Sequence, residues 1–137
     1  MDDCVFCAIA AHRAPASLIY EDESSLAFLD IHPITRGHTL VIPREHCENI
    51  YELSEAAGAA VIRAASRIAR TLRQELQPDG LNLIQSNGRA AGQTVFHFHL
   101  HLVPRWNKDG LFLPPHSPVL AERTNLEALA EALRARL

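Results

Sequence analysis

The sequence predicts an antiparallel α+β domain, and three observations lead to that fold class. Short β-branched runs separated by turn residues stand before and after one long amphipathic segment, residues 54–77. Strands, then a helix, then strands again are typical of the α+β class. No glycine- and serine-rich linker, internal repeat or low-complexity tract divides the chain, so we expect residues 1–137 to form a single domain.

Five segments are predicted to be strands. Two short apolar segments flank the polar turn 22–24, which is a hairpin signal. A third run ends at Pro43, where a proline suits the end of a strand. Two more follow the long helix and bracket a polar loop, residues 86–94. The five predicted strands are 17–21, 25–30, 38–43, 81–85 and 95–103.

Two helices are predicted. The long one has Ser54 as a plausible N-cap, and the turn residues 78–80 end it. Its apolar stripe is Val61, Ala65, Ile68, Leu72 and Leu76, and its other side carries Arg63, Arg67, Arg70 and Arg73, interpreted as a solvated face. The C-terminal helix is predicted to begin at a capping box formed by Thr124 and Glu127. Its apolar stripe is Leu126, Leu129, Leu133 and Leu137.

The composition argues against several classes of function. With 47% hydrophobic and 21% charged residues, the chain has the balance of a globular protein. Its net charge of −3 argues against a groove for long nucleic acid. No apolar run approaches the roughly 20 residues of a membrane span. The N-terminus lacks the basic and apolar regions of a secretion signal, so we expect a cytoplasmic protein without a membrane partner.

Three histidines alternate with apolar residues in the last predicted strand, at His97, His99 and His101. Because side chains alternate across a strand, the three are expected to share one face. The opposite face, formed by Phe96, Phe98, Leu100 and Leu102, is expected to pack on the core. Buried imidazoles would each need a hydrogen-bond partner, so the histidine face is expected to line a cleft.

Two chemistries suit this row. A three-histidine zinc centre is one, but His97 and His101 would lie about 13 Å apart along a strand, whereas zinc ligands lie about 2 Å from the metal. The other is nucleophilic attack on phosphorus by a neutral imidazole, for which the middle residue, His99, is the natural candidate.

The preceding loop offers amides, a hydroxyl and backbone N–H groups that suit a phosphate, although hairpin loops favour such residues in any protein. These residues are Asn87, Gly92, Gln93 and Thr94.

With this histidine row, the sequence resembles the histidine triad (HIT) family, and within it the histidine triad nucleotide-binding proteins. Residues 97–103 match every position of the family motif His-φ-His-φ-His-φ-φ, where φ is apolar. Further blocks match in order at 28–31, 37–43 and, together with Asn87, 92–95. The resemblance covers about residues 4–105 and leaves 106–137 as a variable tail with the C-terminal helix. It implies a HIT-like fold with a five-stranded antiparallel sheet.

The resemblance also implies an activity. Family members hydrolyse or transfer nucleoside monophosphates from phosphoramidates, adenylated amines or dinucleoside polyphosphates. By resemblance, His99 attacks the α-phosphorus of a purine nucleotide and forms a covalent intermediate that water cleaves, while His101 contacts the phosphate and His97 and His38 orient the site. The implied nucleotide-binding residues are Asp30 for the ribose, Phe6, Ile9, Phe28 and Ile31 for the base, and Asn87, Gly92, Gln93, Thr94 and Val95 near the phosphate. Without the resemblance, Asp30 is a strand-end cap and the apolar residues are plain core.

Cysteines at positions 4 and 7 form half of a zinc site, because two thiolates at this spacing can bind one metal. In some bacterial members of the family the site is completed by two histidines that correspond to His46 and His97. The resemblance therefore implies a structural Cys2His2 zinc site. The alternatives are a pair of thiols without metal and, less favoured, a redox motif. Cys47 is interpreted as a bystander.

Two classes of function fit the sequence. One is a nucleotide-processing enzyme, and the other is a nucleotide-binding regulatory or scaffold protein with little catalysis. The intact His99 favours the enzyme. The resemblance further implies a homodimer in which two sheets join and the long helices pack together.

Overall fold

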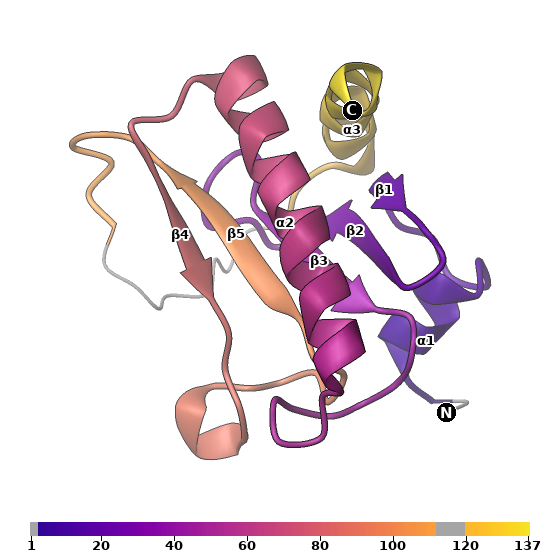
Figure 1. Cartoon of the computed structure of the whole chain (residues 1–137). Helices are drawn as coiled ribbons and strands as arrows, with labels where there is room; N and C mark the ends of the chain where they lie inside the picture. The colour runs from indigo at the N-terminus through magenta and orange to yellow at the C-terminus, as the bar shows by residue number, and fades with distance from the viewer. Residues whose placement is uncertain (1–2, 112–119) are drawn as a thin grey trace.

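The computed structural model describes residues 3–111 and 120–137, which are built around a five-stranded antiparallel sheet (Figure 1). The strands lie in the order β1-β2-β3-β5-β4, so the last strand of the chain lies between β3 and β4. They are β1 (Leu18–Glu21), β2 (Ser25–Leu29), β3 (Thr39–Pro43), β4 (Gly80–Ile84) and β5 (Leu100–Arg105). The predicted α+β class and its five-stranded sheet are confirmed, with boundaries within a few residues for the first four strands.

The strand predicted over 95–103 is where the structure differs most from the sequence pattern. β5 begins only at Leu100 and runs on to Arg105. Before it, the backbone N–H of Phe98 donates to the carbonyl of Cys47 at 2.7 Å, and the side-chain amide of Gln93 donates to the carbonyl of Val95 at 3.1 Å. These two bonds join the segment to a nearby loop and to its own turn, and residues 95–99 are not part of β5.

Helix α2 (Glu55–Leu76) crosses one face of the sheet, as Figure 1 shows. Its N-cap is Ser54, whose hydroxyl accepts a hydrogen bond from the N–H of Ala57 at 3.1 Å, as predicted. The predicted arginine face is exposed. The buried side of α2 packs on a core that includes Ala27, Leu29, Val41, Leu100 and Leu102 of the sheet.

Helix α3 (Arg123–Arg136) packs beside α2 and β1. The predicted capping box is wrong: the helix begins one residue before Thr124, and the carboxylate of Glu127 accepts a hydrogen bond from the Ser17 hydroxyl at 2.9 Å. Of the predicted stripe, Leu137 is exposed and the other three leucines are buried.

A short helix that the sequence pattern did not predict, α1 (Val5–Ala10), covers the other face of the sheet. Six residues are too few to show a helical period. Phe6 and Ile9 of α1 pack with Leu26, Phe28, Leu40 and Ile42 in a second core. A single 3₁₀ turn, η1 (Arg89–Ala91), lies in the loop between β4 and β5. Of the predicted variable tail 106–137, residues 112–119 lie outside the described part of the chain.

None of the helices in residues 3–111 and 120–137 is both long enough and apolar enough to cross a membrane.

Candidate functional site

A cavity of about 260 Å³ opens on the α1 side of the sheet. Its walls are mostly apolar, with a few polar groups at defined places, which is the usual character of a small-molecule site. The structure brings eight of the predicted nucleotide-binding and catalytic residues to this cavity. They are Phe6, Ile9, Phe28, Asp30, Ile31, Val95, His99 and His101.

His99 is held in one orientation at the wall of this cavity. Its ring Nδ1 lies 2.7 Å from the backbone carbonyl of His97, and a carbonyl can only accept, so Nδ1 carries the proton. The other nitrogen, Nε2, then keeps its lone pair in the neutral ring. Burial lowers the pKa of His99, which favours this neutral form at pH 7. The ring of Phe6 packs against it edge-on, with centroids 5.2 Å apart.

His101 is oriented by a chain of hydrogen bonds that ends on the backbone. The N–H of Ile34 donates to Nδ1 of His38 at 3.0 Å, which places the proton of a neutral His38 on Nε2. That Nε2 lies 2.8 Å from Nδ1 of His101 and 3.5 Å from a carboxylate oxygen of Asp30. His101 therefore accepts at Nδ1 and carries its own proton on Nε2.

Asp30 connects this chain to the cavity wall. It follows β2 directly, and its carboxylate accepts a hydrogen bond from the N–H of His32 at 2.8 Å. This bond is the turn-forming role that any aspartate can have at the end of a strand. The second carboxylate oxygen faces His38, so Asp30 serves both the turn and the histidine pair.

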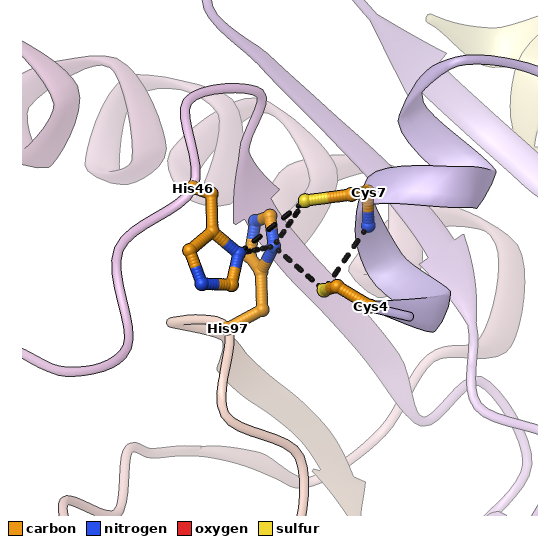
Figure 2. A group of neighbouring side chains, drawn as sticks. All are labelled: Cys4, Cys7, His46 and His97. Atoms are coloured by element: carbon orange, nitrogen blue, oxygen red, sulfur yellow. Dashed lines mark hydrogen bonds between the residues drawn. The ribbon is translucent and has the colours of Figure 1, made fainter. Parts of the chain in front are cut away.

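The first histidine of the row does not line the cavity. His97 is completely buried, and its ring meets Cys4, Cys7 and His46 in a compact cluster (Figure 2). Its Nδ1 lies 3.4 Å from the Sγ of Cys4, 3.5 Å from the Sγ of Cys7 and 3.3 Å from Nδ1 of His46. The expectation that all three histidines of the row face one cleft is therefore wrong for His97, because residues 95–99 leave the regular strand geometry.

The cluster has the dimensions of a tetrahedral zinc site. With Zn–S near 2.3 Å and Zn–N near 2.0 Å, the edges of such a tetrahedron measure about 3.3–3.8 Å. The Sγ of Cys7 lies 3.3 Å from Nδ1 of His46, and all four donor atoms lie within 4.8 Å of one another. Nε2 of His97 donates to the carbonyl of Pro43 at 2.8 Å, so Nδ1 presents its lone pair to the cluster. Such an outer partner is typical of a metal-binding histidine.

The Cys7 thiol does not resemble the reactive thiol of a redox pair. Burial raises the pKa of the Cys7 thiol, as does its neighbour Cys4, whereas reactive CxxC motifs have lowered thiol pKa values. Cys4 also caps α1, because its sulfur accepts a hydrogen bond from the N–H of Cys7. Cys47 is buried in the main core, outside the cluster.

The four loop residues predicted near a phosphate do not line the cavity. The buried amide of Gln93 bonds to Gly88, Glu48 and Val95, at 2.6–3.1 Å. The side-chain oxygen of Asn87 accepts from the N–H of Ile50 at 2.8 Å, and Gly92 and Thr94 are exposed. Conversely, the cavity includes Arg123, which the sequence pattern did not indicate, because nothing local in the chain connects α3 to the histidine row.

A family model for the HIT domain matches residues 11–108. This chain belongs to the HIT domain family. Among relatives of the HIT family, the protein named "Protein hit" of Bacillus subtilis is 49% identical over 107 residues, which are 78% of this chain and 74% of that protein. An uncharacterised HIT-like protein of Mycobacterium tuberculosis is 49% identical over 108 residues, 79% of this chain and 75% of that protein.

Solved structures of HIT proteins share the fold. A zinc-bound histidine triad family protein of Mycobacterium smegmatis superposes with a TM-score of 0.84 at 45% identity, covering 98% of this chain and 92% of that chain. A HIT-like protein of Bartonella henselae, described as involved in cell-cycle regulation, superposes with a TM-score of 0.91 at 34% identity, covering 100% and 98%. The HIT-like fold that the motif predicted is therefore confirmed.

Proposed function

We propose that this HIT protein is a nucleotide hydrolase or transferase that cleaves nucleoside 5′-monophosphate derivatives through a covalent nucleotidyl-His99 intermediate. Phosphoramidates, adenylated amines and dinucleoside polyphosphates are the proposed substrates. One observation carries the proposal: the hydrogen bond from His99 to the carbonyl of His97 leaves Nε2 with its lone pair, on a ring that lines an apolar cavity. A neutral imidazole with an orienting partner is the arrangement that nucleophilic catalysis requires.

The reaction takes two steps. Nε2 of His99 forms a bond to the α-phosphorus as the bond from phosphorus to the leaving group breaks. Water then attacks the same phosphorus, and the bond from phosphorus to Nε2 breaks. Summed over both steps, water adds its hydrogen to the leaving group and its hydroxyl to phosphorus, and His99 is regenerated. His101, whose Nε2 carries a proton, is the proposed hydrogen-bond donor to a phosphate oxygen or to the leaving group.

The remainder of the cavity suits a nucleoside. Asp30 is the proposed partner of the ribose hydroxyls, and the apolar walls formed by Phe6, Ile9, Phe28 and Ile31 are the proposed base site. Asn87, Gly92, Gln93 and Thr94 remain the proposed phosphate loop. For that role the Gln93 amide must exchange its present bonds within the loop for bonds to the phosphate.

The Cys4, Cys7, His46 and His97 cluster is the proposed site of one structural zinc ion. The edge lengths, the tautomer of His97 and the zinc-bound state of the Mycobacterium smegmatis relative support this proposal. When bound, zinc supplies a cross-link between α1, the segment after β3 and the start of the histidine row. We assign it no part in the chemical steps.

Two apolar side chains are exposed on the surfaces of β4 and α2. β4 is an edge strand, and its residue Leu83 is exposed, as is Ile62 on α2. We propose that these surfaces join two copies of the chain, as the HIT resemblance implies.

The proposed compartment is the cytoplasm. A thiol pair that binds a metal rather than forming a disulfide fits that reducing environment.

Turnover of an adenosine phosphoramidate and of a diadenosine polyphosphate tests the proposal directly. The wild type is expected to hydrolyse at least one of them, and His99→Asn is expected to lose about 10³-fold or more in kcat/KM, because the covalent route then lacks the imidazole that forms the bond to phosphorus. His12→Asn is the matched control, since His12 is an exposed histidine that pairs with Glu21 and does not line the cavity. A wild type that binds AMP without turnover would favour the regulatory nucleotide-binding alternative. Equal turnover by wild type and His99→Asn would refute the assignment of the nucleophile.

A further inference from the structure

Arg123 is a cation in a cavity whose walls are mostly apolar. Among the described residues, it is the only arginine or lysine that lines this cavity. It reaches there from the first turn of α3, on the opposite face of the sheet from α1. The backbone brings it to the cavity because the N–H of Ala121 donates to the carbonyl of Ile31 at 2.9 Å, which ties the start of α3 to the end of β2.

Arg123 is an exposed residue, and one arm of its guanidinium is bonded to a buried hydroxyl. Nη1 of Arg123 donates to the Oγ of Ser17 at 3.3 Å, and that hydroxyl donates in turn to the carboxylate of Glu127 at 2.9 Å. Ser17 is fully buried and directly follows Ala16, a cavity-lining residue. The guanidinium is therefore bonded to the residue that follows Ala16, whereas the ring of His99 packs against Phe6 and that of His101 against His38.

We propose that Arg123 selects the base, favouring a 6-oxopurine nucleotide over an adenine nucleotide. This inference rests on the proposed nucleotide site. A guanidinium is a rigid fork of N–H donors and matches two adjacent acceptors, such as O6 and N7 of guanine or hypoxanthine. Adenine presents N7 as an acceptor but a donating amino group in place of O6, so it can satisfy only one arm of the fork. Within the described part of the chain, Ser17 accepts from one N–H of Arg123, and the remaining N–H groups are the proposed donors to the base.

Equilibrium binding of GMP, IMP and AMP tests this choice without depending on turnover. All three carry the same ribose and phosphate, so a difference between them reports on the base. In the wild type, GMP and IMP are expected to bind on the order of tenfold more tightly than AMP. Arg123→Met, which keeps much of the length and loses the fork, is expected to abolish that difference. Arg123→Lys is expected to reduce it, because an ammonium is not a planar fork. Arg134→Met is the matched control on the same helix, outside the cavity.

Several outcomes would overturn the assignment. Equal binding of the three nucleotides by the wild type would do so. An equal loss for all three in Arg123→Met would place the guanidinium on the ribose or phosphate instead. A preference for GMP alone would point to the 2-amino group, which O6 and N7 recognition does not read. If no nucleotide binds to the wild type, the proposed function fails together with this inference, whereas binding without discrimination refutes the inference alone.

Discussion

The Nδ1–H of His99 donates to the backbone carbonyl of His97 at 2.7 Å, while the side chain of His97 lies in the Cys2His2 cluster. One residue therefore connects the proposed zinc site to the proposed nucleophile, through its main chain. If zinc holds His97, it also holds the carbonyl that sets the tautomer of His99. This relationship gives the cluster an expected effect on the reaction without any metal chemistry.

Loss of one thiol from the cluster is expected to affect metal content, stability and rate together. In Cys7→Ser, zinc affinity is expected to fall by at least about 100-fold, since changes merely in the outer partners of a metal site already cost 10–100-fold. The thermal midpoint and kcat are expected to fall with it. Metal analysis, thermal unfolding and turnover measure the three effects. Cys47→Ala is the control, because it removes a buried sulfur outside the cluster. Full zinc occupancy in Cys7→Ser would show that Cys7 is not a ligand.

Asp30→Asn is expected to weaken nucleotide binding by roughly tenfold, because a neutral amide is a poorer acceptor for ribose hydroxyls than a carboxylate. The asparagine oxygen can still accept from the N–H of His32, so the turn after β2 is expected to survive. Binding of AMP and of 2′,3′-dideoxy-AMP to both proteins measures the effect. The dideoxy nucleotide lacks both hydroxyls, so the variant is expected to bind it as the wild type does. An equal loss for both nucleotides would argue against a ribose contact.

Gly37→Ala is expected to destabilise the fold by about 1–3 kcal/mol. Gly37 has φ of +90°, and a Cβ there would lie 2.5 Å from Cδ1 of Leu76 and 3.2 Å from Cδ2 of Leu72. Both backbone strain and crowding against α2 therefore oppose a side chain. Urea unfolding measures the change. Gly80→Ala is the matched control, since a Cβ there meets no atom within 4 Å. A change below about 0.5 kcal/mol in Gly37→Ala would show that the turn before β3 adapts.

The exposed edge strand β4 is the proposed place where two copies of the chain join. Light scattering is expected to give about twice the chain mass of 15.2 kDa for the wild type. Leu83→Lys is expected to shift the protein toward the monomer, because it places a charge on the proposed apolar edge. Leu137→Lys is the control, an exposed leucine at the end of α3. A wild-type monomer, or a dimer unaffected by Leu83→Lys, would contradict an interface at β4.

The periodicity of the chain predicted most of the fold. The four- and three-residue spacing from Val61 to Leu72 specified α2, and the capping hydroxyl of Ser54 marked its start. These features are local, because a helix satisfies its hydrogen bonds within its own segment. The spacing of the histidine row and of the CxxC pair is also local in the chain, and it indicated His99, Cys4 and Cys7. The predicted capping box at Thr124 is wrong, because Glu127 accepts its hydrogen bond from Ser17, far away in the chain, and the helix begins one residue before Thr124.

The tertiary structure decided what depends on distant partners. The sequence determined the alternation over 95–103, but a strand needs a neighbouring strand to bond to. The backbone N–H of Phe98 donates instead to the carbonyl of Cys47, and the side chain of His97 donates to the carbonyl of Pro43. That departure from strand geometry turns His97 away from the cavity toward the cysteines, and leaves His99 and His101 to line it. Arg123 enters the cavity for a similar reason. Its place depends on how α3 docks against the end of β2, which is a contact between segments some 90 residues apart that no local pattern encodes.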